Sequence, residues 1–375
     1  MAKELLMDLR KKLTIISLIF GIRIRKRIRR NKIKKILLLR YDRIGDMVVT
    51  TPLIRELTKR GYEVSTISQK DSIDFISKNP YIKNTYIWNR DNKSMFKNAM
   101  SIRKYKYDLA IDMREQLEVK TFLFSLITGA KYLAGFNKAN IRKFDHSISY
   151  NHPNNHITMK MDAILKELFD IYNADLHYDA FIDDETENNA ISFISDINKL
   201  NGKVVVINPF ASLRERDMSI EQLTHVINEI KKEYTDACII LIGNECLLNN
   251  LPEVGAHIFH SKSILDVLPV IKHSDLVLTV DTAALHLAGA YDRKIVGLYG
   301  IFNWDEYTQW LKWDIFNSKA LPDNFDIKNY LHNNEHSFGI KSLNVSESLH
   351  SEKGTLINTI PKDKIAESVL RILKS

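Results

Sequence analysis

The sequence predicts a two-domain α/β protein in which each domain is built on a parallel β-sheet. Its 375 residues exceed what a single hydrophobic core usually supports, so two domains are expected. Short apolar strands alternate with amphipathic helical patterns, which is typical of parallel sheets covered by helices on both faces. This alternation stops near residue 150 and starts again near residue 203. Two similar sheets joined by a linker would leave a cleft between them.

The first series of strands and helices follows a basic amino-terminal segment. Its strands are short apolar runs, and its helices carry apolar residues at steps of three and four. We expect strands at 36–40, 62–68, 108–112 and 132–135, and helices at 47–60, 115–128 and 157–172.

The second series begins with a helix that starts in the acidic segment 183–189. Strands are then expected at 203–208, 237–242, 276–280 and 295–299, and helices at 219–234 and 264–273. Aromatic residues cluster at 304–313, and 317–354 has weak periodicity, so this region is either a surface loop or a cover over an acceptor site. Pro361 begins a closing helix. The predicted division is an arm (1–34), a first Rossmann-like domain (35–180), a second (181–350) and a carboxy-terminal helix (361–375).

The net charge of +8 is concentrated in the amino-terminal arm. Eleven Lys and Arg residues between Arg23 and Arg43 face a single acidic residue, Asp42, and without this stretch the chain is close to neutral. A basic arm on a neutral body argues against a broad nucleic-acid surface, so no nucleic-acid partner is expected. The two cysteines, Cys238 and Cys246, lack the spacing of a metal site, and a reducing compartment fits them.

Apolar residues in the arm recur at helical spacing from Leu5 to Ile28, with Lys and Arg on the other face. This pattern predicts a basic amphipathic helix that lies on an anionic membrane surface through residues 4–35. Its apolar run, 13–22, is about half the ~20 residues needed to span a bilayer. The basic block follows the apolar run, which disfavours a signal peptide. The alternative is a helix that packs on the protein's own body or on a second subunit.

The segment from 276 to 300 reads as one strand–helix–strand unit with polar residues at the turn. Asp281 and Thr282 follow a buried strand, and His286 lies on the helix that begins there. Ligands of parallel sheets bind beyond the carboxyl ends of the strands, where helix-start N–H groups can hold a phosphate or diphosphate. The alternative is that Asp281 is only a helix N-cap.

Three further turns place polar groups at strand ends. In the turn 40–46, Gly45 allows either a close backbone approach or a positive φ, and Asp46 is either a general base or a helix cap. Because this turn lacks G-x-G-x-x-G, a nicotinamide cofactor is not expected. The turn 208–217 carries Ser212 and Arg216, which suit an anionic leaving group. At 242–245, the Glu245 carboxylate could accept hydrogen bonds from ribose hydroxyls.

Taken together, these motifs resemble glycosyltransferase family 9, the heptosyltransferases. The resemblance runs in order through four segments, which are 38–52, 207–212, 243–245 and 281–300. It implies a GT-B fold and an inverting transfer of heptose from ADP-heptose to a lipopolysaccharide or lipooligosaccharide core. It also implies a lipid-linked acceptor, no cofactor or catalytic metal, and a cytoplasmic enzyme peripheral to the bacterial inner membrane.

The resemblance also implies roles for individual residues. Asp46 matches the catalytic base, and Arg43 and Gly45 lie beside it on the acceptor side of the cleft. The residues that match the donor side are Ser212, Arg216, Glu245, Asp281, Thr282, Ala283 and His286. Ala283 replaces the family's usual Gly, and Arg216 replaces its usual Lys, so the class of donor is better supported than its identity.

Several other functions fit part of the sequence. A glycosyltransferase of this fold could use another nucleotide sugar, because sugar choice depends on the shape of the cleft. A sugar-nucleotide epimerase with two such sheets would turn over a donor without an acceptor. A non-catalytic membrane-surface or nucleic-acid-binding protein would depend on the arm alone.

Overall fold

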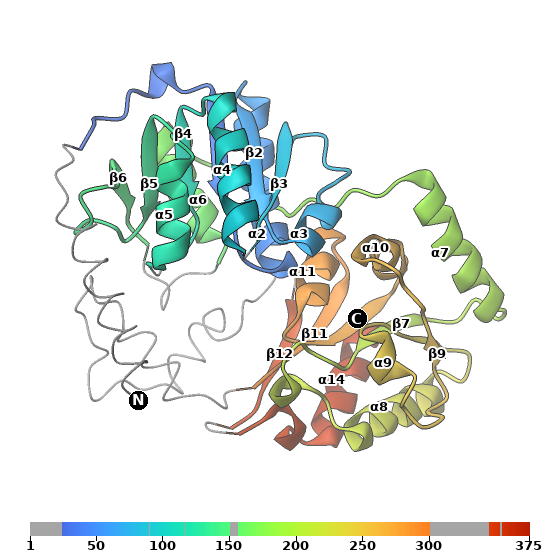
Figure 1. Cartoon of the computed structure of the whole chain (residues 1–375). Coiled ribbons are helices and arrows are strands. Elements are labelled where there is room, and N and C mark those ends of the chain that lie inside the picture. Colours follow the sequence, from blue (N-terminus) through green and yellow to red (C-terminus); the bar gives the residue numbers. More distant parts are fainter. Residues whose placement is uncertain (1–24, 90, 116, 151–156, 301–344, 353–354) are drawn as a thin grey trace.

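The computed structural model describes residues 25–89, 91–115, 117–150, 157–300, 345–352 and 355–375. It contains two six-stranded sheets, in the orders β3-β2-β1-β4-β5-β6 and β12-β11-β10-β7-β8-β9 (Figure 1). Every neighbouring pair of strands is parallel. The predicted fold class, two parallel-sheet α/β domains, is confirmed.

The first sheet is sandwiched between two layers of helices. Side chains alternate along a strand, so Ile36 and Leu38 of β1 pack with α2 and α6, whereas Leu37 and Leu39 pack with α4 and α5. The elements are β1 (Lys35–Leu39), α2 (Ile44–Lys59), β2 (Glu63–Ser68), α3 (Lys70–Phe75), β3 (Asn84–Ile87), α4 (Asn92–Tyr105), β4 (Leu109–Asp112), α5 (Val119–Ile127), β5 (Tyr132–Phe136), β6 (His146–Ile148) and α6 (Met159–Phe169).

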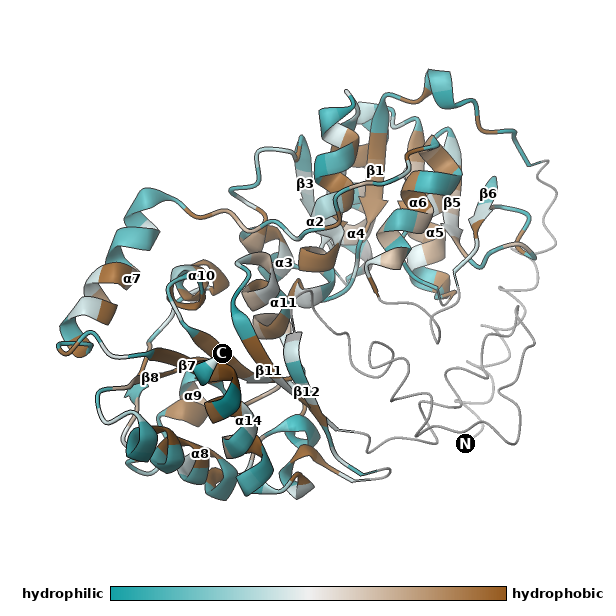
Figure 2. Ribbon diagram, turned by 180° about the vertical axis from the view of Figure 1, so that it is seen from behind, coloured by the Kyte–Doolittle hydropathy of each residue, from teal (hydrophilic) through white to brown (hydrophobic). Residues whose placement is uncertain are grey.

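The second sheet has the same layered arrangement. Helices α8 and α14 cover one face, and α10 and α11 cover the other, with apolar strands between them (Figure 2). The elements are α7 (Asp184–Ile197), β7 (Val204–Asn208), the 3-10 turn η3 (Arg214–Arg216), α8 (Ile220–Glu233), β8 (Cys238–Leu241), α9 (Glu245–Leu248), β9 (His257–Ile258), α10 (Ile264–Lys272), β10 (Leu276–Val280), α11 (Ala283–Ala290), β11 (Lys294–Tyr299), β12 (Val345–His350), η4 (Ile357–Thr359) and α14 (Lys362–Lys374).

The two domains share one continuous apolar core. Helix α2 of the first domain packs directly against α11 of the second, and residues of both belong to the same cluster of buried side chains. The segment between the domains is also fastened to α2. The buried Arg55 guanidinium donates to the carbonyls of Asp175 at 2.7 Å and His177 at 2.9 Å. The facing helix starts therefore lie close together.

The arm differs from the expected helix over its described part. Residues 25–29 are not helical, and only a 3-10 turn, η1 (Arg30–Lys32), follows them. The Lys26 N–H donates to the Asp145 carboxylate at 2.9 Å, and Arg30 Nε donates to the Leu168 carbonyl at 3.0 Å. These contacts with the body take the place of a last helical turn, so the expected extension of the helix to Ile28 is wrong.

Two other expectations concern segments that lie wholly or partly outside the described residues. Residues 1–24 and the aromatic cluster at 304–313 lie outside them. The weakly periodic segment 317–354 does contain a strand, β12, which pairs with β11 at the edge of the second sheet. Among the described helices, none is both long and apolar enough to cross a lipid bilayer.

Candidate functional site

In the first domain, the turn after β1 presents Asp46 under the control of a buried arginine. Arg40 is 2% exposed, and its guanidinium lies 2.7 Å from the Asp46 carboxylate and donates twice to the Asp46 carbonyl. The Thr50 hydroxyl donates to the same carbonyl at 2.8 Å. The residue at the N-cap position of α2 is Arg43, so Asp46 lies in the first turn and is not a cap. Its side chain is held in one place and remains 26% exposed.

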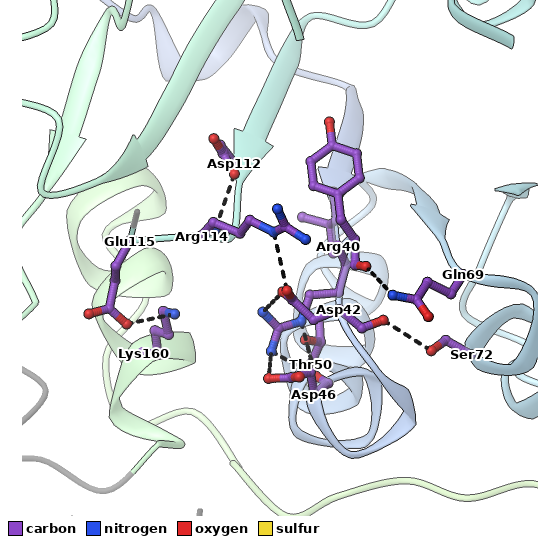
Figure 3. A network of polar contacts seen from close by, with 12 residues as sticks. Arg40, Asp42, Asp46, Thr50, Gln69, Ser72, Asp112, Arg114, Glu115 and Lys160 are labelled. Carbon is purple, nitrogen blue, oxygen red and sulfur yellow. Dashed lines mark hydrogen bonds and ion pairs between the residues drawn. The ribbon is translucent and has the colours of Figure 1, made fainter. Parts of the chain in front are cut away.

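The same arginine connects Asp46 to a second carboxylate and to β4. Arg40 also pairs with Asp42 at 3.0 Å, and Arg114 pairs with Asp42 at 3.2 Å (Figure 3). The Arg114 N–H donates to the buried Asp112 carboxylate at 3.1 Å. Burial raises the pKa of Asp112 to about 6, although the nearby Lys138 cation opposes this rise.

The sequence reasoning missed Asp112 and Arg114 as members of the site. Both lie at the carboxyl end of β4, which neighbours β1. The rule that drew attention to Asp46 and Asp281, polar groups at the carboxyl ends of parallel strands, would have found them too.

In the second domain, the turn before α11 contains a helix N-cap, Thr282, and a carboxylate in an ion pair, Asp281. Thr282 is the N-cap, and its hydroxyl accepts from the Ala284 N–H at 3.3 Å and lies 2.7 Å from the Asn208 amide. The Asp281 carboxylate instead pairs with Arg216 at 2.9 Å. The alternative of Asp281 as an N-cap is therefore wrong.

Asp281 and Asp46, which lie on different domains, interact electrostatically. Burial raises the pKa of the Asp281 carboxyl above its ordinary value, and the Arg216 cation opposes that rise. The negative charge of Asp46, on the other domain, raises the same pKa further. Asp46 and Asp281 are therefore near enough to interact across the domain contact, although neither lines the cavity described below.

The start of α2 contacts α11 directly. A Cβ atom at Gly45 would lie 3.0 Å from Cδ2 of His286 and 3.7 Å from Cα of Ala283. His286 is 3% exposed, and its ring contacts the Tyr178 ring edge-on at 5.9 Å. His286 therefore packs where the domains meet, and Gly45 permits the close approach that the sequence predicted for it.

A cavity of about 690 Å³ opens beside this contact and is lined from both domains. The second domain contributes Ser212, Thr282 and Ala283, and the first contributes Ile44 and residues of α3. Above it, the Arg43 guanidinium donates to the Ser212 hydroxyl, so the two domains also meet through these side chains. Ala283 and Ala284, which begin α11, line this cavity, and the Ala284 N–H is bonded to the Thr282 hydroxyl.

The expected donor residues do not all line this cavity. Glu245 begins α9 and pairs with His260 at 2.8 Å, and both side chains are more than half exposed. Its neighbours Gly243 and Asn244 line the cavity in its place. Arg216, Asp281 and His286 do not line the cavity either, and neither does Asp46.

The architecture resembles solved glycosyltransferase structures over nearly its whole length. The match with a glycosyltransferase family 9 structure from Veillonella parvula DSM 2008 covers 91% of this chain and 97% of that chain, with a TM-score of 0.71 and 13% sequence identity. The match with an Escherichia coli ADP-heptose lipopolysaccharide heptosyltransferase II covers 91% of this chain and 98% of that chain, with a TM-score of 0.64 and 14% sequence identity. Two parallel-sheet domains around a cleft, with polar turns at facing helix starts, define a GT-B fold.

The family follows from the sequence. The family model described as glycosyltransferase family 9 (heptosyltransferase) matches residues 95–328. The chain belongs to this family and is a glycosyltransferase. An Escherichia coli (strain K12) relative, provisionally named lipopolysaccharide heptosyltransferase 4, is 24% identical over 324 residues, which is 83% of this chain and 87% of the relative. Membership of a transferase family disfavours the epimerase and the non-catalytic interpretations.

Proposed function

We propose that this enzyme transfers a heptose from ADP-heptose, with inversion, to the core sugar of a lipopolysaccharide or lipooligosaccharide. The observation that carries this proposal is the contact between the start of α2, which carries Asp46, and the start of α11, which follows Asp281, beside a cavity lined from both domains. Family membership supports a heptose donor. A solved Escherichia coli relative, heptosyltransferase WaaC, was determined with ADP and with ADP-2-deoxy-2-fluoro heptose.

In the proposed mechanism, Asp46 removes the proton of the acceptor hydroxyl. The hydroxyl oxygen then forms a bond to the anomeric carbon from one face, and the bond from that carbon to the diphosphate oxygen breaks on the other face. The diphosphate leaves with the electron pair of that bond, and its charge is stabilised by N–H groups at the start of α11, by Thr282 and by Arg216. We propose that these groups serve without a metal or a cofactor. Arg40 keeps the Asp46 carboxylate oriented toward the acceptor throughout.

The base assignment is tested with Asp46→Asn in the full chain. We expect turnover to fall by about 100-fold or more, with donor affinity unchanged, because the amide cannot accept the proton. Asp42→Asn is the matched control, since Asp42 pairs with the same Arg40 guanidinium. Unchanged turnover in Asp46→Asn, or equal losses in both variants, would reject the assignment.

The donor is tested by thermal shift with a panel of nucleotide sugars. A ligand that binds only the folded state raises the melting temperature according to its affinity. We expect stabilisation by ADP-heptose and not by UDP- or GDP-sugars. A shift with another nucleotide sugar alone would replace heptose as the donor.

We also propose that the enzyme is cytoplasmic and lies on the inner face of the bacterial inner membrane. The support is the basic amphipathic sequence of residues 4–35, whose described part, 25–34, exposes most of its cations. A lipid-linked acceptor would be reached from that surface. Loss of vesicle binding on deletion of residues 1–31 supports this proposal, and unchanged binding refutes it.

A further inference from the structure

The end of the first domain that lies farthest from the second domain carries an unusual distribution of charge. It consists of η1 and the turns that precede β1, β2, β4 and β5, where the parallel strands begin (Figure 1). We call this end the basic pole. Asp46 follows β1 and therefore lies at the opposite end of the same sheet.

The cations of the basic pole are exposed. Six of them form no ion pair with a described residue, whereas Arg30 pairs with Asp170 and Arg60 pairs with Glu56. They come from separate segments, so a broad surface is covered, not a single helix face. The six that carry the argument are Arg27, Arg29, Lys32, Lys104, Lys106 and Lys131.

The acidic groups of the same end bond to the protein itself, and all of them except Asp170, which pairs with Arg30, are only partly exposed. Asp108 accepts from the N–H groups of Lys34 and Lys35 at 2.9 and 3.0 Å. Asp145 accepts from two main-chain N–H groups at 2.9 and 3.0 Å, and Glu63 accepts from a tyrosine hydroxyl at 2.6 Å. The carboxylates are turned into the structure while the cations extend into solvent. The surface potential of the pole is therefore positive.

The described part of the arm, residues 25–34, is held to this end by another cation, Arg30. Arg30 donates to the carbonyls of Glu167 and Leu168 at the end of α6 and pairs with Asp170. Between this segment and the starts of β5 and β6 lies a recess of about 1020 Å³, whose lining includes more cations, among them Arg27 and Lys131, than carboxylates, which are Asp145 and Glu167. A recess with these cations suits a phosphate-bearing head group.

Helix dipoles do not account for the pattern. Basic side chains favour the last turn of a helix, which explains Lys104 at the end of α4. Arg27, Arg29 and Lys131 lie in no helix. The helix dipole therefore does not explain the positions of these three cations.

We propose that the basic pole docks on an anionic phospholipid bilayer. This deepens the membrane contact proposed above for residues 4–35 and rests on it. Cations spread over several turns at one end of the sheet match a planar anionic surface. Each cation near such a surface strengthens binding by about fivefold.

The orientation has a consequence for the acceptor. A five-residue strand at about 3.3 Å per residue separates the pole from the cleft end of the sheet by roughly 17 Å. The reacting hydroxyl is thus held away from the bilayer surface. The acceptor must carry a saccharide spacer between its lipid and the sugar that reacts.

The test compares two triple variants of the full chain, both with intact arms. Lys104→Gln/Lys106→Gln/Lys131→Gln neutralises the pole, and Lys199→Gln/Lys232→Gln/Lys364→Gln removes the same charge from exposed sites of the second domain. Binding is measured by cosedimentation with vesicles of phosphatidylcholine, with and without phosphatidylglycerol. We expect the pole variant to lose about 100-fold in partitioning onto the anionic vesicles and the control to lose little.

Three outcomes would overturn the docking surface. Equal binding by the pole variant and the unmodified chain, with loss on deletion of residues 1–31, would leave the arm as the membrane contact and remove the pole. Equal losses in both triple variants would reduce the effect to net charge. Pole-dependent binding of a single-stranded RNA oligonucleotide, without vesicle binding, would replace the bilayer by a nucleic acid. Unchanged melting temperatures verify that all variants are folded.

Discussion

Substitution of Gly45 by alanine would separate the two domains by a small and calculable distance. The new methyl carbon would lie 3.0 Å from Cδ2 of His286 and 3.7 Å from Cα of Ala283. Carbon atoms in contact prefer about 3.5–4.0 Å, so α2 and α11 must move apart by roughly 0.5 Å. His286 is 3% exposed, and its ring has little room to move away.

The change should affect turnover more than stability. Overpacking of a buried contact costs about 1–3 kcal/mol, and alanine in place of glycine in a helix returns about 1 kcal/mol. We therefore expect a net loss of about 1 kcal/mol in the free energy of unfolding. A displacement of about 1 Å between reacting groups can cost about 100-fold in rate, so roughly 0.5 Å should lower kcat/KM about tenfold.

The assay measures kcat/KM and chemical denaturation of Gly45→Ala, His286→Ala and the double variant. The smaller side chain at position 286 relieves the clash. The kcat/KM of the double variant should therefore be close to that of His286→Ala. His286→Ala alone should have the milder effect on rate, since His286 supports α11 and does not line the cavity. Wild-type turnover in Gly45→Ala, or additive losses in the double variant, would refute the argument.

The remaining predictions concern two carboxylates, Asp112 and Glu245, and one arginine, Arg216. Because the pKa of Asp112 is raised from 3.8 to about 6, its ionisation should reduce folding stability as pH rises from about 4 to 6, an effect that Asp112→Asn removes; parallel stability profiles by urea titration would contradict this. Arg216→Ala should raise the donor KM about tenfold or more, since it leaves Asp281 without its cation beside the diphosphate, and an unchanged KM would exclude donor binding there. Glu245→Ala should change the donor KM less than about twofold, because the carboxylate pairs with exposed His260; a larger loss would place Glu245 in the donor site.

Elements with a strong burial signal were predictable from the sequence. Strands β1, β7 and β10 are continuous apolar runs with every residue or nearly every residue buried, and the structure has them at the predicted places. The missed strands lie at sheet edges. Strand β3 alternates between half-buried and exposed residues, and β6 has only three residues. Helix α4 leaves Phe96 and Met100 exposed, so its apolar stripe is weak.

The candidate site was predictable in its parts but not in its pairings. Asp46 and Asp281 were found because polar residues after buried strands meet at one edge of a parallel sheet. The Arg40 contacts, the Arg216 to Asp281 pair and the Gly45 to His286 contact depend on how separate segments pack. No periodicity or spacing carries that information. Glu245 shows the reverse case, in which a residue at a favourable strand end lies outside the cavity.

The apolar core that runs through both domains has a consequence for how the protein must be handled. Helix α11 buries all but the first of its eight residues, and much of the covering comes from α2. Either half expressed alone would expose this apolar surface to water and would tend to aggregate. The same continuity should make the chain melt in a single calorimetric transition. Opening of the cleft during turnover must then occur by small sliding of packed helices, and wide separation of the domains is disfavoured.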